Sequence, residues 1–300
     1  MDGLETRELR YFVAVAEELH FGRAAERLTM AQPPLSRAIQ QLERRLGVSL
    51  LDRDRRGVSL TPAGETMLVE ARHALDAVDA TVRRTRRAAA ARPALVLTTK
   101  AGASHQLLKE LLDAYAARPD AVEIDVLLCE IGEQGQRLRD GRADVAIMHA
   151  PFDVMTGLDS AEILTEGQVA IVPAAHPLAR RTSLTMAEVS AVPDLPIARW
   201  PRHDHTYPPG PGPEVRSQSQ LAQLVALGRT LLVIPASSRA WQWPEHVAVP
   251  VLDAPSATTL LAWPAGVHSG ALAGLVETAQ QLEPSDFGGR TDAVDHEFAG

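Results

Sequence analysis

The sequence is poor in cysteine and in long apolar runs. Its single cysteine, Cys129, has no second thiol with which to form an internal disulfide, and one thiolate is too few for a cysteine-held metal site. No run of about 18 apolar residues occurs, which argues against a membrane-spanning helix. The opening stretch MDGLETRELRYF carries acids and turn-formers where an export signal needs a basic and then an apolar stretch, so we expect a cytoplasmic protein.

Motifs of catalysis are also lacking. The sequence has neither a Gly-x-Ser-x-Gly nucleophile elbow nor a GxxxxGK[ST] phosphate loop. His203, Asp204 and His205 are three metal-ligand types, but the imidazoles are only two positions apart beside a Pro- and Gly-rich stretch at 208–213, which is more typical of a surface loop. We therefore expect no metal, no cofactor and no enzymatic activity.

What is present is the composition of a globular chain with two or three domains. Of its 300 residues, 45% are hydrophobic and 23% are charged. The net charge of −8 is unevenly spread, because residues 1–92 hold 16 arginines against 13 acidic residues and so carry +3, which leaves −11 for the rest. A small basic head on a large acidic body is typical of a nucleic-acid-binding protein.

Three short helices are predicted before Gly47. Apolar side chains recur at helical spacing over residues 8–19 and 22–28. The third helix begins at the proline pair 33–34 and ends at Gly47, because proline is favoured in a first helical turn and glycine just past the last. A tight connection at residues 29–32 joins the second helix to the third.

The second and third helices match a helix-turn-helix. The third helix turns hydroxyl, amide and guanidinium groups away from its apolar stripe, and such groups read base edges or hold phosphates in the major groove. An ordinary helical pair with a solvated polar face shows the same pattern, so the context decides. The polar residues of this helix are Ser36, Arg37, Gln40, Gln41 and Arg44.

A hairpin with a basic tip follows. Short apolar runs at 48–51 and 58–60 flank the segment 52–57, which is rich in arginine. In a winged helix-turn-helix such a tip lies beside the duplex, where arginines neutralise phosphates. The candidate phosphate contacts are Arg53, Arg55 and Arg56, while Asp52 and Asp54 either orient these arginines or solvate the turn.

A long helix is predicted next. Thr61 and Pro62 provide an N-cap and a first-turn proline, and Glu65 lies where the helix dipole favours an acid. A helix that runs to about residue 89 spans roughly 43 Å at about 1.5 Å per residue. Its apolar residues step by 3, 4, 3 and 4, which favours pairing with a second copy, or packing against the chain's own body. The candidate dimerisation residues are Leu68, Ala71, Leu75, Val78 and Val82.

This ordered set of motifs resembles the DNA-binding head of LysR-type transcriptional regulators. The matching stretches are LRYF at 9–12, FGRAAERL at 21–28, AQPPLSRAI at 31–39, LE at 42–43, LG at 46–47 and LTPAG at 60–64. The resemblance implies a winged head, a dimerising linker helix and a periplasmic-binding-protein-like effector domain, commonly assembled as a tetramer. It places DNA contacts at Gln32, Pro33, Pro34, Ser36, Arg37 and Arg53. Leu51 stands where the family usually has phenylalanine, a departure that concerns the packing of the wing.

The body beyond residue 93 alternates between strands and helices. Strands are predicted at 95–99, 122–128, 144–148, 162–173, 231–235 and 258–263, and helices at 106–117, 134–140, 220–227 and 271–282. Alternation of this kind predicts right-handed crossovers and a parallel sheet covered by helices. The carboxyl ends of the strands then face one crevice, where small anions bind.

The predicted fold class is an α/β chain with an N-terminal all-α winged helix-turn-helix, a long linker helix and a two-lobed effector domain. The predicted DNA-binding domain covers 1–60, the linker 61–90 and the effector domain 91–284, with a flexible tail at 285–300. By resemblance to the family, lobe one of the effector domain holds 91–163 and 266–284, and lobe two holds 164–265.

The crevice is the candidate effector site. A carboxylate effector needs a cation or hydroxyl donors, although each candidate also fits a solvated loop or a packing role. Gly102 stands where the family often has serine, and Glu130 with Ile131 where it has threonine or serine, so Glu130 weakens the case for an anion. Cys129 is expected to be an inert packing residue. The candidate effector contacts are Lys100, Gly102, Ser104, His105, Glu130, His149, Arg202 and Ser217.

The sequence thus predicts a LysR-type regulator whose binding to double-stranded promoter DNA is modulated by a small molecule. We expect a cytoplasmic, nucleoid-associated homodimer or homotetramer that has no membrane contact and has RNA polymerase as a further candidate partner. The alternatives are a solute-binding protein with an accessory interaction head, which leaves the basic wing without a role, and an enzyme built on an α/β body.

Overall fold

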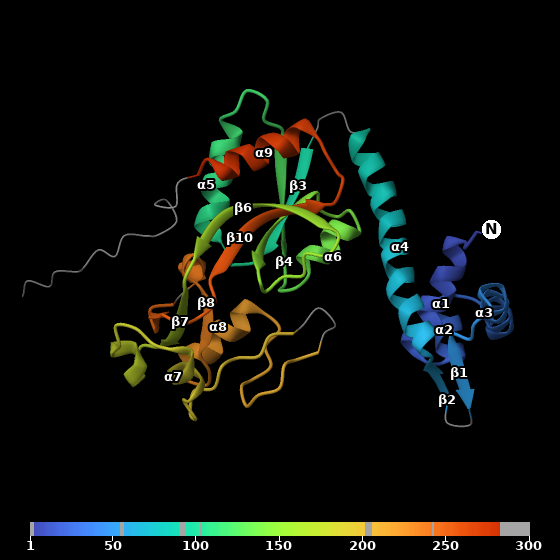
Figure 1. Ribbon diagram of the computed structural model, residues 1–300, viewed down its shortest axis with the longest axis horizontal. Coiled ribbons are helices and arrows are strands. Elements are labelled where there is room, and N and C mark those ends of the chain that lie inside the picture. The colour runs from blue at the N-terminus through green and yellow to red at the C-terminus, as the bar shows by residue number, and fades with distance from the viewer. Residues whose placement is uncertain are drawn as a thin grey trace, which may run out of the picture. The chain divides into compact units, whose positions relative to one another are not determined.

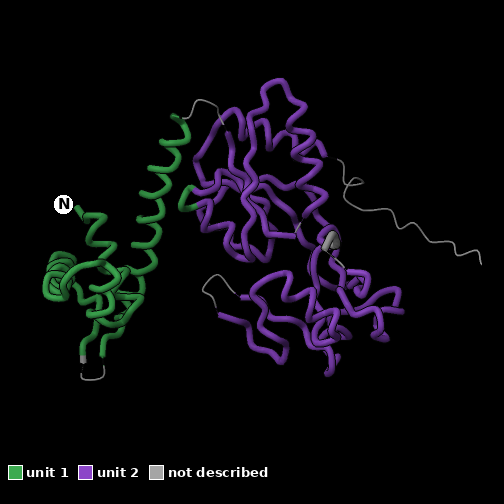
Figure 2. Tube along the Cα trace, turned by 180° about the vertical axis from the view of Figure 1, so that it is seen from behind, with its two compact units in different colours: residues 1–89, 139–141 green, residues 90–138, 142–300 purple. Residues whose placement is uncertain are grey.

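A computed structural model describes residues 3–54, 57–89, 94–102, 104–201, 206–241 and 243–282. The chain divides into two compact units, residues 1–89 together with 139–141, and residues 90–138 together with 142–300 (Figure 2). Residues 3–89 are called the head below, and residues 94–282 the body.

The head is a small helical bundle that carries a hairpin and a long helix (Figure 1). Its elements are α1 (Thr6–Glu18), α2 (Phe21–Arg27), α3 (Gln32–Leu46), β1 (Leu51–Asp54), β2 (Gly57–Leu60) and α4 (Pro62–Ala88). Phe12 of α1, Ala24 of α2 and Leu35 of α3 are fully buried in one core. Since α2 and α3 are joined by a short turn and followed by the hairpin, the predicted winged helix-turn-helix is present.

Local sequence explains where these helices begin and end. The Nδ1 atom of His20 accepts hydrogen bonds from the N–H groups of Gly22 and Arg23, at 3.1 and 3.2 Å, and so caps α2. Helix α3 has proline in its first turn and ends at Gly47, whose φ of +72° is readily adopted only by glycine.

The start of α4 lies directly against the wing. The Thr61 hydroxyl accepts the N–H of Gly64 at 3.0 Å and donates to the carbonyl of Ser49 at 2.8 Å. A Cβ atom at Gly64 would be 2.0 Å from the carbonyl oxygen of Leu50, so a glycine is required here. The LTPAG stretch therefore joins the hairpin to the long helix by close backbone contact.

The wing lies further along the chain than predicted. Its strands pair from Leu51 with Leu60 to Asp54 with Gly57, so residues 52–54 belong to a strand and not to the tip. The reason is a contact from α3: the Glu43 carboxylate accepts the N–H groups of Leu50 and Leu51, at 2.8 and 3.1 Å, so the preceding residues are held beside the helix. Arg55 and Arg56 lie outside the described residues.

The body contains a five-stranded sheet with the strand order β4-β3-β5-β10-β6 (Figure 1). These strands are β3 (Ala94–Lys100), β4 (Glu123–Cys129), β5 (Val145–Ala150), β6 (Leu158–Glu166) and β10 (Ala257–Pro264), and the helices that cover them are α5 (His105–Ala116), α6 (Gln134–Arg139) and α9 (Gly270–Gln280). Strands β3, β4 and β5 are parallel, while β10 is antiparallel to both of its neighbours, so the sheet is mixed. Helices α5 and α9 pack with Leu97 and Ile147 on one face, and α6 packs with Met148 on the other.

A second, three-stranded antiparallel sheet has the order β8-β7-β9. Its strands are β7 (Gln168–Pro173), β8 (Leu232–Pro235) and β9 (His246–Val251), accompanied by the helices α7 (Met186–Ser190) and α8 (Gln218–Ala226) and the 3-10 helices η1 (Pro177–Arg180) and η2 (Ala236–Trp241). Val172 and Leu231 are buried with α7, whereas Ile171 and Leu232 are buried with α8.

The chain passes between the two sheets at Gly167 and again between β9 and β10. The single strand predicted over 162–173 was wrong, because it is two strands in different sheets that break at Gly167. Strand β10 was placed in lobe two by the expected range 164–265, but it pairs with β5 and β6 in the first sheet. Apolar residues lie on both sides of the break, at 163–164 and 169–172, so hydrophobic pattern alone did not separate the two strands.

Candidate DNA interface and effector site

Helix α3 turns a polar face away from the core of the head. Leu35, Ile39 and Leu42 are buried on its inner face. The outer face carries Pro33, Arg37, Gln40 and Arg44, which are 4, 3 and 4 residues apart in the sequence and are all exposed. The exposed positions of this helix also include Gln32, while Pro34 and Ser36 are half-buried. Arg44 was predicted to lie outside the apolar stripe but was not among the candidate DNA contacts, although its spacing from Arg37 and Gln40 places it on the same face.

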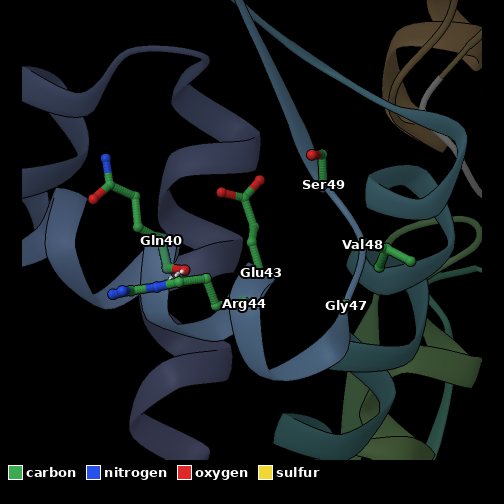
Figure 3. A pocket seen from close by; sticks show the side chains of 6 residues that line it. All are labelled: Gln40, Glu43, Arg44, Gly47, Val48 and Ser49. Atoms are coloured by element: carbon green, nitrogen blue, oxygen red, sulfur yellow. Dashed lines mark hydrogen bonds between the residues drawn. The ribbon is translucent and has the colours of Figure 1, made fainter.

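A hollow of about 470 Å³ lies beside the carboxyl-terminal half of this helix (Figure 3). It is lined by Gln40, Glu43, Arg44, Gly47, Val48 and Ser49. Figure 3 shows Gln40 and Arg44 on the helix side, and Val48 and Ser49 on the extended segment across from them. The Nε atom of Arg44 donates to the carbonyl oxygen of Gln40 at 3.3 Å. The hollow therefore brings polar groups of α3 next to the backbone that leads into the wing.

The side chain of Arg53 is held between two helices. Its guanidinium carbon lies 4.5 Å from the centroid of the Phe21 ring, and its Nη2 atom lies 3.5 Å from Oε2 of Glu43. The cation–π contact and the ion pair restrict the guanidinium, while 33% of the side chain stays exposed. Arg53 thus presents a positioned cation close to the start of α2.

Several other arginines of the head are paired with carboxylates. Arg27 and Arg72 both contact Glu17, at 2.7 Å each, and Arg45 contacts Glu8. Burial raises the pKa of Glu17, but the hydrogen bonds from Arg72 and Arg27 outweigh it and hold this pKa below its usual value. Arg37, in contrast, forms no ion pair with any described residue.

Part of the apolar seam of α4 serves the head itself. Ala71 is buried in the core of the head, and Leu68 and Leu75 pack against that core. The expectation that all five seam residues face a second copy is therefore corrected: the 3–4 spacing of these three residues is explained by the packing of α4 on the head. Val82 is 44% exposed, which leaves it available to a partner.

The predicted effector residues of the first sheet gather at one edge. Lys100 ends β3, His149 is the penultimate residue of β5, and Ser104 precedes α5. Thr258 at the start of β10 pairs with Ala150, so the chain returns from the second sheet at this same edge. The carboxyl ends of the parallel strands thus lie where the two lobes are joined, as the sequence predicts.

Hydrogen bonds connect these residues. The Ser104 Oγ and His149 Nε2 atoms are 3.0 Å apart, and both side chains are buried. The Lys100 Nζ atom lies 3.0 Å from Oδ2 of Asp153, and this oxygen also accepts the N–H of His149 at 2.8 Å. Asp153 was not among the candidates predicted from the sequence. The signal that could have indicated it is an acidic residue a few positions after a strand that ends at the crevice.

The imidazole of His149 is neutral. Burial lowers its pKa to about 3, the Lys100 ammonium acts in the same direction, and the Asp153 carboxylate opposes them. His149 therefore interacts by hydrogen bonding and brings no charge to this edge at ordinary pH.

The remaining candidates are more scattered. Gly102, His105 and Glu130 are exposed at the first sheet, whereas Ser217 caps α8 beside the second sheet by accepting the N–H of Gln220 at 3.2 Å. Arg202 and residues 203–205 lie outside the described residues.

Cys129 is buried, and burial raises the pKa of its thiol, which favours the unreactive protonated form. The described residues contain no cluster of three or more residues that could ligate a metal, and none of their helices is long and apolar enough to cross a membrane.

Both parts of the chain match models of known families. Residues 6–65 match the bacterial regulatory helix-turn-helix protein, lysR family, and residues 88–283 match the LysR substrate binding domain. The chain belongs to the LysR family of DNA-binding transcriptional regulators, which carry a substrate-binding effector domain. The resemblance and the fold class predicted from the sequence are confirmed, and the solute-binding alternative is wrong.

Relatives and solved structures support this assignment along nearly the whole chain. The Hca operon transcriptional activator HcaR of Escherichia coli is 31% identical over 93% of this chain and 98% of its own. The regulator BenM of Acinetobacter baylyi is 31% identical over 85% and 88%. The crystal structure of full-length BenM covers 93% of this chain and 96% of its own, with a TM-score of 0.51 and 29% identity. CbnR bound to its target DNA, 24% identical over 92% and 99% with a TM-score of 0.57, shows likeness of fold.

Proposed function

We propose that the exposed face of α3 and the positioned Arg53 bind promoter DNA, and that a small molecule at the carboxyl edge of the five-stranded sheet modulates this binding. The observation that carries the proposal is that Arg37 forms no ion pair with a described residue, while Arg27, Arg45 and Arg72 of the head are paired with carboxylates. An unpaired guanidinium on an exposed helix face is available to a guanine or a phosphate.

The proposed contacts divide into base readers and phosphate contacts. Ser36, Arg37 and Gln40 have side chains that address base edges. Arg44 lines the hollow and Arg53 pairs with Glu43 of the same hollow, and both guanidinium groups suit phosphates. The proposed interface also includes Gln32, Pro33 and Pro34 at the amino end of α3 and, from the sequence alone, Arg55 and Arg56.

The proposed effector site uses Lys100, Ser104 and His149. It offers hydroxyl and imidazole groups that are buried, and an ion pair that is nearly buried. A ligand regulates DNA binding only if its binding free energy differs between two arrangements of the protein, so we infer that closing of the lobes on the ligand changes how the heads are held.

We infer a homodimer or homotetramer. A DNA site with twofold symmetry is bound by two heads, and pairing of α4 with α4 of a second copy would hold these heads together. Val82 is exposed on α4 and is available for this pairing. We place the regulator in the cytoplasm on the nucleoid, where it acts by binding and not by catalysis. We propose that the DNA-binding domain ends at residue 60, the linker at residue 90 and the effector domain at residue 284.

Footprinting of the region upstream of the gene tests the proposal. Purified full-length protein should protect two half-sites about one helical turn, or a multiple of it, apart. Protection should change in extent when the effector is added. If no sequence in that region is protected at low salt, the proposed role in promoter binding is wrong.

A further inference from the structure

We propose that Asp153 determines the chemical class of the effector: the site takes an α-amino-acid-like zwitterion in preference to a plain carboxylate. This inference rests on the effector site proposed above. It starts from the ion pair between Lys100 and Asp153, which already occupies the cation that an acidic ligand would need.

The pair is tightly held and nearly buried. Nζ of Lys100 and Oδ2 of Asp153 are 3.0 Å apart, and the side chains are 12% and 7% exposed. The backbone N–H of His149 donates to the same carboxylate oxygen. The chain has one other lysine, Lys109, which lies on the exposed surface of α5.

A plain carboxylate would bind at a disadvantage. By taking Lys100 it would leave the buried Asp153 carboxylate without a cation, and an unpaired buried charge is strongly unfavourable. The neutral His149 supplies no replacement. The loop after β4 adds negative charge through the exposed Glu130, while Arg137 in the following helix is paired with Glu133 at 2.8 Å.

A zwitterion avoids this penalty because it brings a cation of its own. Its carboxylate pairs with Lys100 and its ammonium group with Asp153, so one ion pair is replaced by two and no charge is left alone. An amine without a carboxylate would in turn leave Lys100 unpaired. The same site therefore discriminates against both singly charged analogues.

The edge also holds buried polar atoms that lack a partner. The Thr99 and Thr259 hydroxyls and Nδ1 of His149 have no hydrogen-bond partner among the described residues, and all three side chains are almost completely buried. Thr259 is the cross-strand partner of His149. Buried polar groups are nearly always hydrogen-bonded, so we expect these three groups to bind a polar ligand or water at this edge.

Calorimetric titration of the full-length protein tests the inference. The common α-amino acids are screened first, and the best binder is compared with its deaminated acid and its decarboxylated amine. We expect the zwitterion to bind about tenfold tighter, or more, than either analogue. If the deaminated acid binds as well as the amino acid, or if no amino acid binds, the inference is wrong.

Two variants and a control make the test specific. Asp153→Asn should remove the internal competitor, so that the deaminated acid gains affinity and the amino acid loses its advantage. Exchange of the pair, as Lys100→Asp with Asp153→Lys, should retain preference for the zwitterion even if the single variant is unstable. Asp113→Asn breaks the exposed Lys109–Asp113 pair, at 2.8 Å, and should change neither affinity.

The outcomes separate this inference from the proposed function. If a plain carboxylate binds best and changes promoter protection, the regulator and its effector site stand and the zwitterion preference falls. If Asp153→Asn leaves the ratio of the affinities unchanged, Asp153 does not determine the ligand class.

Discussion

The Glu43 carboxylate accepts the backbone N–H of Leu50 at 2.8 Å and thereby fixes the start of the wing to the end of the recognition helix α3. The same side chain binds the N–H of Leu51 and lies beside Arg53. One carboxylate thus aligns the wing backbone and the cation proposed to contact a phosphate.

Glu43→Ala should lower the free energy of unfolding of the head by about 1–3 kcal/mol, because it leaves two buried N–H groups without a partner. Glu43→Gln keeps an acceptor oxygen and should be less destabilising. Urea denaturation measures both. Glu26→Ala, at an exposed position of α2, is the matched control and should be nearly neutral.

Arg37→Ala should weaken promoter binding by about 1–3 kcal/mol if Arg37 reads a base. If it contacts a phosphate instead, the dependence of log affinity on log salt should lose about one unit of slope. Fluorescence anisotropy at several salt concentrations distinguishes the two. Arg45→Ala, which removes an arginine paired with Glu8, should affect binding less. Unchanged affinity of Arg37→Ala at every salt concentration would exclude Arg37 from the interface.

Val82→Asp should dissociate the oligomer without unfolding the head, because Val82 is exposed on α4. Leu75→Asp should lower the stability of the head as well, since Leu75 packs against its core. Sedimentation velocity reports the mass, and thermal unfolding reports the stability. An unchanged sedimentation coefficient for Val82→Asp would place the partner contact elsewhere.

The stability of the body should depend on pH through His149. Its pKa in the folded chain is about 3, against 6.5 when it is unperturbed, so between these values the unfolded chain binds a proton that the folded chain excludes. The free energy of unfolding should therefore fall as the pH drops below about 6.5, by up to about 1.4 kcal/mol per pH unit from this group. His149→Gln should flatten that slope in denaturant titrations. Equal slopes in both proteins would show that His149 is not kept neutral by folding.

The helices of the head were predictable because their signals are local. Leu35, Ile39 and Leu42 repeat at helical spacing, and Pro33 and Gly47 mark the limits of α3, so the observed helix agrees closely with the predicted one. The strands of the wing were predicted too early in the chain because their position depends on Glu43 of α3. No sequence pattern indicates that the Glu43 carboxylate accepts the N–H of Leu50.

The effector site was also only partly predictable, because some of its contacts join separate elements. The carboxyl ends of β3 and β5 could be assigned to one edge from strand order alone, which places Lys100 near His149. The pairing of Lys100 with Asp153 could not, because it depends on how the residues after β5 turn back toward β3. The stacking of Arg53 on Phe21 likewise joins two elements that are distant in the sequence.

The contact between Gly64 and the carbonyl of Leu50 has a consequence for signalling. Main chain rests on main chain at this point, with no side chain between the two segments that could bend or slide. We therefore expect the wing and the first turn of α4 to tilt together as one unit. If effector binding acts through α4, we expect it to reposition the whole head without reshaping the wing, so that the distance and angle between the heads on the promoter change.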